Sequence, residues 1–179
     1  HSRSRRQRQM CIRDSACGVG LVASTEGLKS RKVVEYGIEA LKAVWHRGAI
    51  DADGKTGDGA GIHIEIPNDF FAEKIEITGH EHDNSDLCVG MIFLPRNDFG
   101  GQEQCRSIVE SELTKKNFNI YGWRQVPVDP SVLGEKAEQT RPEITQVLFT
   151  HNDKSIHGKD LERALYDCLL YTSDAADDS

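Results

Sequence analysis

Residues 16–23 read Ala-Cys-Gly-Val-Gly-Leu-Val-Ala, an apolar stretch with glycine at positions 18 and 20. This alternation predicts a β-strand from Cys17 to Ala23, with glycines where another group approaches the backbone closely. The same stretch contains a cysteine, whose thiolate is a strong nucleophile. A predicted strand and a candidate reactive group therefore coincide at this place in the chain.

Cys17 has no side chain beside it that could act as its base. If the chain were cut before Cys17, its own α-amino group could take that role, because an amine with a pKa of about 8 is partly neutral at pH 7. Nucleophile and base would then share one residue, as in N-terminal nucleophile hydrolases. The alternative is a small buried core cysteine. Residues 16–20 alone favour this second interpretation.

Helices and strands are mixed along the rest of the chain. Apolar residues at helical spacing predict a helix from about Arg31 to Trp45, capped by Ser30 and ended near Gly48. The other predicted elements are a strand over 62–66, a short helix at Phe70 and Phe71, a strand over 87–94, a helix over 102–116, strands over 120–128 and 144–150, and a helix over 160–167. This mixture favours a layered α+β or α/β/α arrangement.

The composition fits an ordinary soluble globular protein, with 37% hydrophobic residues and a net charge of −7. That charge gives no electrostatic reason to bind nucleic acid or an anionic membrane. No apolar run is long enough to cross a bilayer. The cysteines form no C-x-x-C pattern, so we expect neither disulfides nor a zinc site, and we expect a cytoplasmic protein.

The two ends of the chain differ in composition from its body. Residues 1–15 contain five arginines, and residues 168–179 contain three aspartates. The first segment could be a nucleic-acid-binding arm or a targeting signal, but it lacks the apolar region of a secretion signal. Both segments resemble translated sequencing-adapter sequence. We therefore expect residues 1–15 to be a leader or an artefact, 16–167 to be the domain, and 168–179 to be an artefactual tail.

Two further segments are candidates for binding. In His46-Arg47-Gly48-Ala49, the arginine could bind a carboxylate, although such arginines are more often structural. The segment Gly54-Lys55-Thr56 superficially resembles a phosphate-binding loop. Ala49 stands where that motif requires its first glycine, and a strand rather than a helix is predicted to follow, so we exclude nucleotide binding. The glycines of residues 56–61 are instead expected to allow close packing against another backbone.

Three residues of a polar loop are possible metal ligands: His80, His82 and Asp83. No further ligand follows at a fixed spacing, so a solvated turn is the better interpretation, and we expect no metal. We likewise interpret His46 as structural rather than as a general base.

The order and spacing of these motifs resemble the start of the large subunit of the glutamate synthases. The matching segments are Ala16–Ala23, Lys29-Ser30, Trp45-His-Arg-Gly-Ala49, Ala52-Asp53, Thr56-Gly-Asp-Gly-Ala-Gly-Ile62, Ile66-Pro67, Val89–Leu94, Tyr121-Gly-Trp-Arg124, Val126-Pro127, Val132-Leu-Gly-Glu135 and Asp160-Leu-Glu-Arg163. The resemblance covers essentially residues 16–167. No single motif is decisive, but the ordered set is specific.

The resemblance implies a class II glutamine amidotransferase domain with the αββα sandwich of the N-terminal nucleophile hydrolases, present here in part. It implies that Cys17 becomes the first residue after a leader is removed and is the catalytic nucleophile that hydrolyses L-glutamine through a thioester. It implies that Arg47 lies in a loop of the glutamine pocket and shapes it or contacts the substrate. The ammonia released would pass to a synthase site that aminates 2-oxoglutarate, a step in nitrogen assimilation.

The same resemblance places FMN and an iron–sulfur cluster in the remainder of the large subunit, which is an expected partner together with a small electron-donating subunit. No cofactor is expected within residues 16–167. Members of the family also use an Asn-Gly oxyanion hole, an arginine and an aspartate further along the chain. This chain contains no Asn-Gly pair, so we expect it to be incomplete at its C-terminal side and inactive by itself. The alternatives are another class II amidotransferase or a non-catalytic interaction domain of the same fold.

Overall fold

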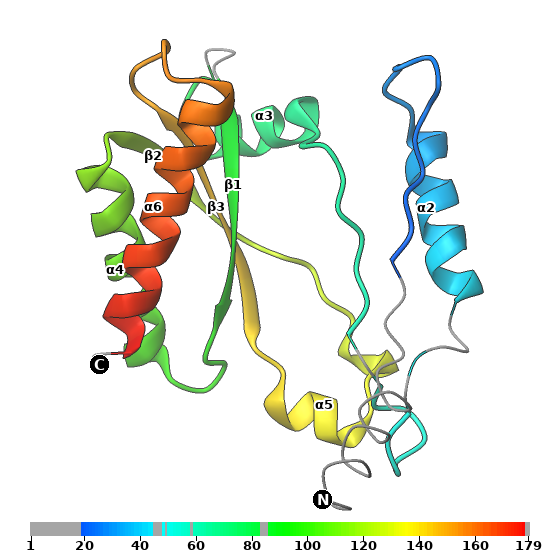
Figure 1. The fold of residues 1–179 in the computed structure, drawn as a ribbon. Coiled ribbons are helices and arrows are strands. Elements are labelled where there is room, and N and C mark those ends of the chain that lie inside the picture. Colours follow the sequence, from blue (N-terminus) through cyan, green and yellow to red (C-terminus); the bar gives the residue numbers. More distant parts are fainter. Residues whose placement is uncertain (1–18, 45–47, 49, 58, 83–85, 178–179) are drawn as a thin grey trace, which may run out of the picture. The chain divides into compact units, whose positions relative to one another are not determined.

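A computed structural model describes residues 19–44, 48, 50–57, 59–82 and 86–177 (Figure 1). The chain divides into two compact units. Unit 1 comprises residues 1–65 and 129–140, and unit 2 comprises residues 66–128 and 141–179. In unit 2, strands β1 (Leu87–Leu94), β2 (Phe118–Gln125) and β3 (Glu143–His151) form an antiparallel sheet in the order β1-β3-β2. The three strands predicted in this region are confirmed, with small shifts at the ends of β2 and β3.

Both faces of this sheet carry hydrophobic clusters, because successive residues of a strand point to opposite sides. On one face, Val147 and Phe149 pack with residues of α4 (Phe99–Lys115) and α6 (Gly158–Asp177). On the other face, Leu148 packs with Phe71 and Ile75 of α3 (Asn68–Ile77). Unit 2 is therefore an α+β layer structure, as the sequence predicts.

A β-bulge in β2 determines which face its aromatic residues occupy. Ile120 pairs with Phe149 and Gly122 pairs with Leu148, so Tyr121 is the extra residue. Tyr121 joins the cluster beneath α3, while Ile120 and Trp123 pack against the opposite cluster. Gly122 has a φ of 150°, which other residues rarely adopt.

The predicted helices are confirmed, and two helical segments were missed. In unit 1, α2 (Arg31–Ala43) begins where Ser30 accepts a hydrogen bond from the Lys32 amide at 3.2 Å. No residue of α2 is fully buried, however, so its apolar face is covered only in part. The segment between the predicted strands over 120–128 and 144–150, for which no element was predicted, contains the short 3-10 helix η2 (Pro130–Val132) and α5 (Glu135–Thr140). In unit 2, α6 continues beyond its predicted end at residue 167, and Cys168 is buried.

Two predicted strands are wrong as far as the structure describes them. Residues 19–23 and 62–66 have no strand assignment, and no named strand of the described part of the chain pairs with either. A strand needs a neighbour to satisfy its backbone hydrogen bonds, and alternation cannot supply one. The second sheet of the expected αββα sandwich is accordingly not found among the described residues.

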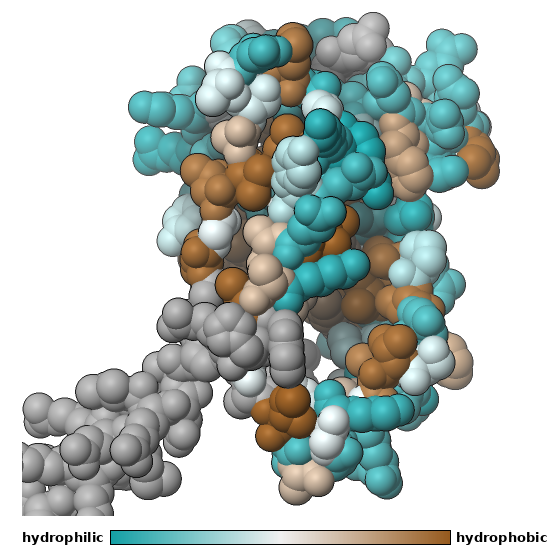
Figure 2. Space-filling model, turned by 90° about the vertical axis from the view of Figure 1, so that its right-hand side faces the viewer, coloured by the Kyte–Doolittle hydropathy of each residue, from teal (hydrophilic) through white to brown (hydrophobic). Residues whose placement is uncertain are grey.

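Large apolar side chains are exposed in unit 1, and Figure 2 shows apolar and polar residues interspersed on the face that it presents. Val19 and Leu21 are almost fully exposed, and Ile62 and Ile64 are about half exposed. Among the helices of the described residues, none is both long and apolar enough to cross a membrane.

Candidate functional site

A small hairpin follows the His46–Ala49 motif in the sequence. Ile50 and Gly57 form an isolated antiparallel bridge, and the Asp51 amide donates a 2.7 Å hydrogen bond to the Thr56 carbonyl. The Gly54 amide donates to the Asp51 carbonyl at 2.9 Å, and Gly54 has a φ of 71°, which glycine adopts without strain. We call residues 50–57 the motif hairpin, because its ends lead directly into two of the quoted motifs.

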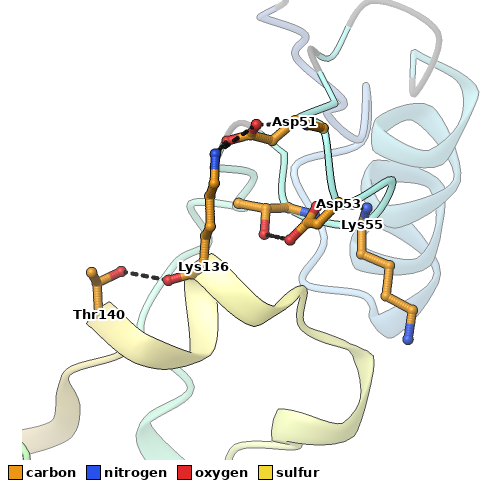
Figure 3. A network of polar contacts seen from close by, with 7 residues as sticks. Asp51, Asp53, Lys55, Lys136 and Thr140 are labelled. Carbon is orange, nitrogen blue, oxygen red and sulfur yellow. Dashed lines mark hydrogen bonds and ion pairs between the residues drawn. The ribbon is translucent and has the colours of Figure 1, made fainter.

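Asp53 stabilises the turn of the motif hairpin from within. Its carboxylate accepts hydrogen bonds from the Lys55 amide at 3.0 Å, the Thr56 amide at 2.7 Å and the Thr56 hydroxyl at 2.5 Å (Figure 3). The Thr56 hydroxyl and the two amides lower the pKa of Asp53 well below its usual value. Asp53 therefore stays ionised and holds the turn at neutral pH.

Lys136 of α5 connects the motif hairpin to a segment far away in the sequence. Its Nζ lies 2.8 Å from each carboxylate oxygen of Asp51 (Figure 3). The hydrogen bond lowers the pKa of Asp51 from its ordinary 3.8 and raises that of Lys136 from 10.5. The contribution of Asp51 to the stability of the folded chain is lost only as pH falls below 3.8, where the carboxylate becomes protonated. The contribution of Lys136 is lost only as pH rises above 10.5, where the ammonium loses its proton. The pair is consequently charged throughout the neutral range.

Gly134, just before α5, packs directly on the Asp53–Thr56 turn. A β-carbon at this buried position would lie 2.5 Å from both the Asp53 Oδ2 and the Thr56 backbone nitrogen. By contrast, a β-carbon on Gly59 or Gly61 would meet nothing within 4 Å. The prediction that the glycines of residues 56–61 pack closely against another backbone is therefore wrong for Gly59 and Gly61. The close contact is found instead at Gly134, for which no packing role was predicted.

The structure places few of the predicted site residues. Cys17, His46, Arg47 and Asp83 lie outside the described residues, so their predicted roles stay predictions. Of the other proposed ligands, His82 Nδ1 lies 3.4 Å from the Tyr121 hydroxyl, and His80 Nδ1 lies 3.1 Å from the Thr78 hydroxyl. Within the described part of the chain, no three His, Cys, Asp or Glu side chains are grouped to hold a metal ion.

The three described cysteines differ in their access to solvent. Burial, with a contribution from Asp86, raises the pKa of the Cys88 thiol to about 11. Cys168 is also buried, and burial raises its pKa. Cys105 is only half-buried. A thiol with a raised pKa and little access to solvent is a poor nucleophile, so neither Cys88 nor Cys168 competes with Cys17 for a catalytic role.

We expect iodoacetamide at pH 8 to modify Cys105 much faster than Cys88. At that pH only about 0.1% of a thiol with a pKa of 11 is ionised, and its sulfur is shielded by the core. Peptide mass spectrometry over a time course measures both rates in the same sample, with urea-unfolded protein as the control. Equal rates for the two residues in the folded chain would contradict the burial of Cys88.

Comparison with known proteins gives one family and a consistent set of relatives. Residues 17–175 match the model of the class II glutamine amidotransferases. The chain is 53% identical over 151 residues to the glutamate synthase [NADPH] large chain of Azospirillum brasilense, covering 84% of this chain and 10% of that protein. It is 38% identical over 154 residues to the chloroplastic ferredoxin-dependent glutamate synthase 2 of Arabidopsis thaliana, covering 86% and 9%. The chain thus spans about a tenth of the length of these relatives.

Proposed function

The chain belongs to the class II glutamine amidotransferase family, and from this we propose that it is the glutaminase part of a glutamate synthase large chain. The observation that carries the proposal is the family match, which begins at Cys17, the residue singled out as nucleophile. The relatives support a glutamate synthase rather than another class II amidotransferase, because those compared are all named glutamate synthases.

In the proposed reaction, the α-amino group of Cys17 takes the proton of the thiol, and the resulting thiolate attacks the side-chain amide carbon of L-glutamine. The tetrahedral intermediate collapses, the carbon–nitrogen bond breaks, and ammonia leaves with a proton supplied by the α-amino group of Cys17. A glutamyl thioester remains, which water hydrolyses to glutamate while the thiol is restored. Arg47 contributes a contact in the glutamine pocket, where a guanidinium can bind a carboxylate through two hydrogen bonds.

The later step, in which ammonia aminates 2-oxoglutarate, is assigned to the remainder of the large chain. FMN and an iron–sulfur cluster would serve that step. The amidotransferase domain itself needs no cofactor, and among the described residues no cysteines or other ligands are grouped to hold a cluster. A small electron-donating subunit and a cytoplasmic location complete the proposal.

An electrophilic glutamine analogue tests this function. We expect a diazoketone analogue to label the full-length chain, processed so that Cys17 is its first residue, with one adduct on the Cys17 peptide by mass spectrometry. Excess L-glutamine should prevent the label, whereas L-asparagine should not. A chain that is processed and folded but forms no adduct would instead be a non-catalytic domain of the same fold.

A further inference from the structure

We propose that β1 is an inner strand of its sheet, and that its outer edge pairs with a fourth strand supplied by the segment that follows α6 in the full-length large chain. This inference rests on the proposed function only in placing the present chain within a longer one. The large chain from Azospirillum brasilense matches this chain over 10% of its own length, so most of such a protein lies outside the residues described here.

The outer edge of β1 has the composition of an inner strand. Among the strands of the described residues, β1 pairs only with β3. Alternate residues of an antiparallel strand direct their amide and carbonyl groups to the same neighbour, so the other residues of Leu87–Leu94 direct theirs to the outer edge. This stretch contains no charged residue and no proline, and its register with β3 is unbroken. Natural edge strands usually carry such protection, because an unprotected edge pairs readily with another strand.

The opposite edge of the sheet, formed by β2, is protected. The register of β2 with β3 shifts between Ile120 and Gly122, and a bulge of this kind bends an edge away from further pairing. Arg124 adds a charge near the end of the strand. The two edges of the sheet therefore differ, and β1 is the edge that is suited to accept a fourth strand.

The order of the elements indicates which segment occupies this edge. In sequence, unit 2 runs β1-α4-β2 and then β3-α6, and β3 lies between β1 and β2 and is antiparallel to both. β1 and β2 are consequently parallel to each other, and α4 connects them across β3. One further strand after α6 would repeat this arrangement and would complete the β-α-β-β-α-β order of the ferredoxin-like folds.

The face on which the helices lie determines the place of the fourth strand. α4 and α6 both pack on the face that carries Val147 and Phe149 (Figure 1). Helical crossovers between parallel strands of one sheet are right-handed in about 98% of cases. Because β1 and β3 run in opposite directions, two right-handed crossovers on the same face must lead in opposite directions across the sheet. The first leads from β1 to β2, so the second leads from β3 past β1. The fourth strand therefore lies beside β1 and antiparallel to it.

The side chains of β1 indicate the chemistry of this strand. Leu87 and Val89 belong to the cluster beneath α3, whereas Met91 and Phe93, further along the same face, are 48% and 64% exposed. Neighbouring strands are stabilised by apolar side chains that lie opposite each other on one face. We therefore expect the fourth strand to place apolar residues beside Met91 and Phe93.

Hydrogen exchange of the full-length chain, measured by mass spectrometry, tests the pairing. With strands on both sides, nearly all amides of peptide 87–94 should exchange slowly, because those at the outer edge also donate hydrogen bonds. Peptide 118–125 from β2 is the matched control in the same sample, since it has the same length and lies at the protected edge. About half of its amides should exchange fast. Fast exchange of half of the β1 amides would overturn the proposal.

A crystal structure of the full-length chain identifies the occupant of the edge. We expect a strand from the segment that follows α6, antiparallel to β1. A strand from any other segment, a second copy of the chain at this edge, or a fourth strand beside β2 would each overturn the proposal. Slow exchange at β1 that is lost on dilution would also overturn it, because the neighbour would then be another molecule.

Failure of the proposed function looks different from failure of this inference. If the glutamine analogue does not label Cys17 but the segment after α6 pairs with β1, the proposed function is wrong and the strand pairing stands. If Cys17 is labelled but half of the β1 amides exchange fast, only the strand pairing is wrong.

Discussion

Replacing Cys17 by alanine in the full-length, processed chain is expected to abolish glutamine hydrolysis, with kcat falling by about 10⁶-fold. In the proposed reaction the Cys17 thiol supplies the atom that forms the covalent intermediate, and alanine offers no substitute. Binding of L-glutamine should persist, because the substitution leaves the substrate contact proposed for Arg47 unchanged. Ammonia release, followed with a coupled assay, measures the loss, and equilibrium dialysis with labelled glutamine measures the binding that remains.

Two controls make this result specific. Cys105→Ala removes a half-buried thiol from α4 and should leave the rate unchanged. Under the proposed function, glutamate formation from added ammonia should also survive in Cys17→Ala, because external ammonia would replace the product of the first half-reaction. An unchanged glutamine-dependent rate in Cys17→Ala would contradict the assignment of the nucleophile.

The strands of the sheet could be predicted because their own residues carry the signal. Residues 87–94 form a continuous apolar run, and the structure gives β1 the same bounds. Residues 62–66 alternate between apolar and polar side chains, which is also a clear strand signal, yet among the described residues no named strand pairs with them. Alternation shows that a segment is suited to a strand, but pairing depends on which neighbour the fold supplies. The error at residues 19–23 has the same cause.

The contacts that hold the motif hairpin could not be predicted from local sequence. Asp51 and Lys136 are 85 residues apart, and nothing around either residue points to the other. Gly134 belongs to the quoted Val132–Glu135 segment. Glycine is required at this position only because any β-carbon would collide with the Asp53–Thr56 turn, which is distant in the sequence. The candidate nucleophile, by contrast, could be predicted from the sequence. The order of motifs along the whole chain pointed to Cys17, whereas its immediate neighbours did not.

Gly134→Ala is expected to destabilise unit 1 and to release the motif hairpin from α5. The new β-carbon would lie 2.5 Å from the Thr56 backbone nitrogen, and real β-carbons essentially never approach another heavy atom closer than 3.0 Å. A backbone atom cannot turn aside as a side chain can, so either the hairpin or the start of α5 must move. Such overpacking typically costs about 1–3 kcal/mol in the free energy of unfolding. Thermal unfolding followed by circular dichroism measures the loss.

Gly61→Ala is the matched control for Gly134→Ala, because its β-carbon would meet nothing within 4 Å. Both substitutions reduce the flexibility of the unfolded chain to the same degree, so a difference between them reports the contact in the folded state. We expect Gly61→Ala to keep or slightly raise the wild-type Tm and to keep the wild-type exchange rate at the Thr56 amide, while Gly134→Ala lowers the Tm and raises the exchange rate. If the two variants had the same Tm, the packing of Gly134 on the Asp53–Thr56 turn would be wrong, and α5 would hold the hairpin through the Lys136–Asp51 pair alone.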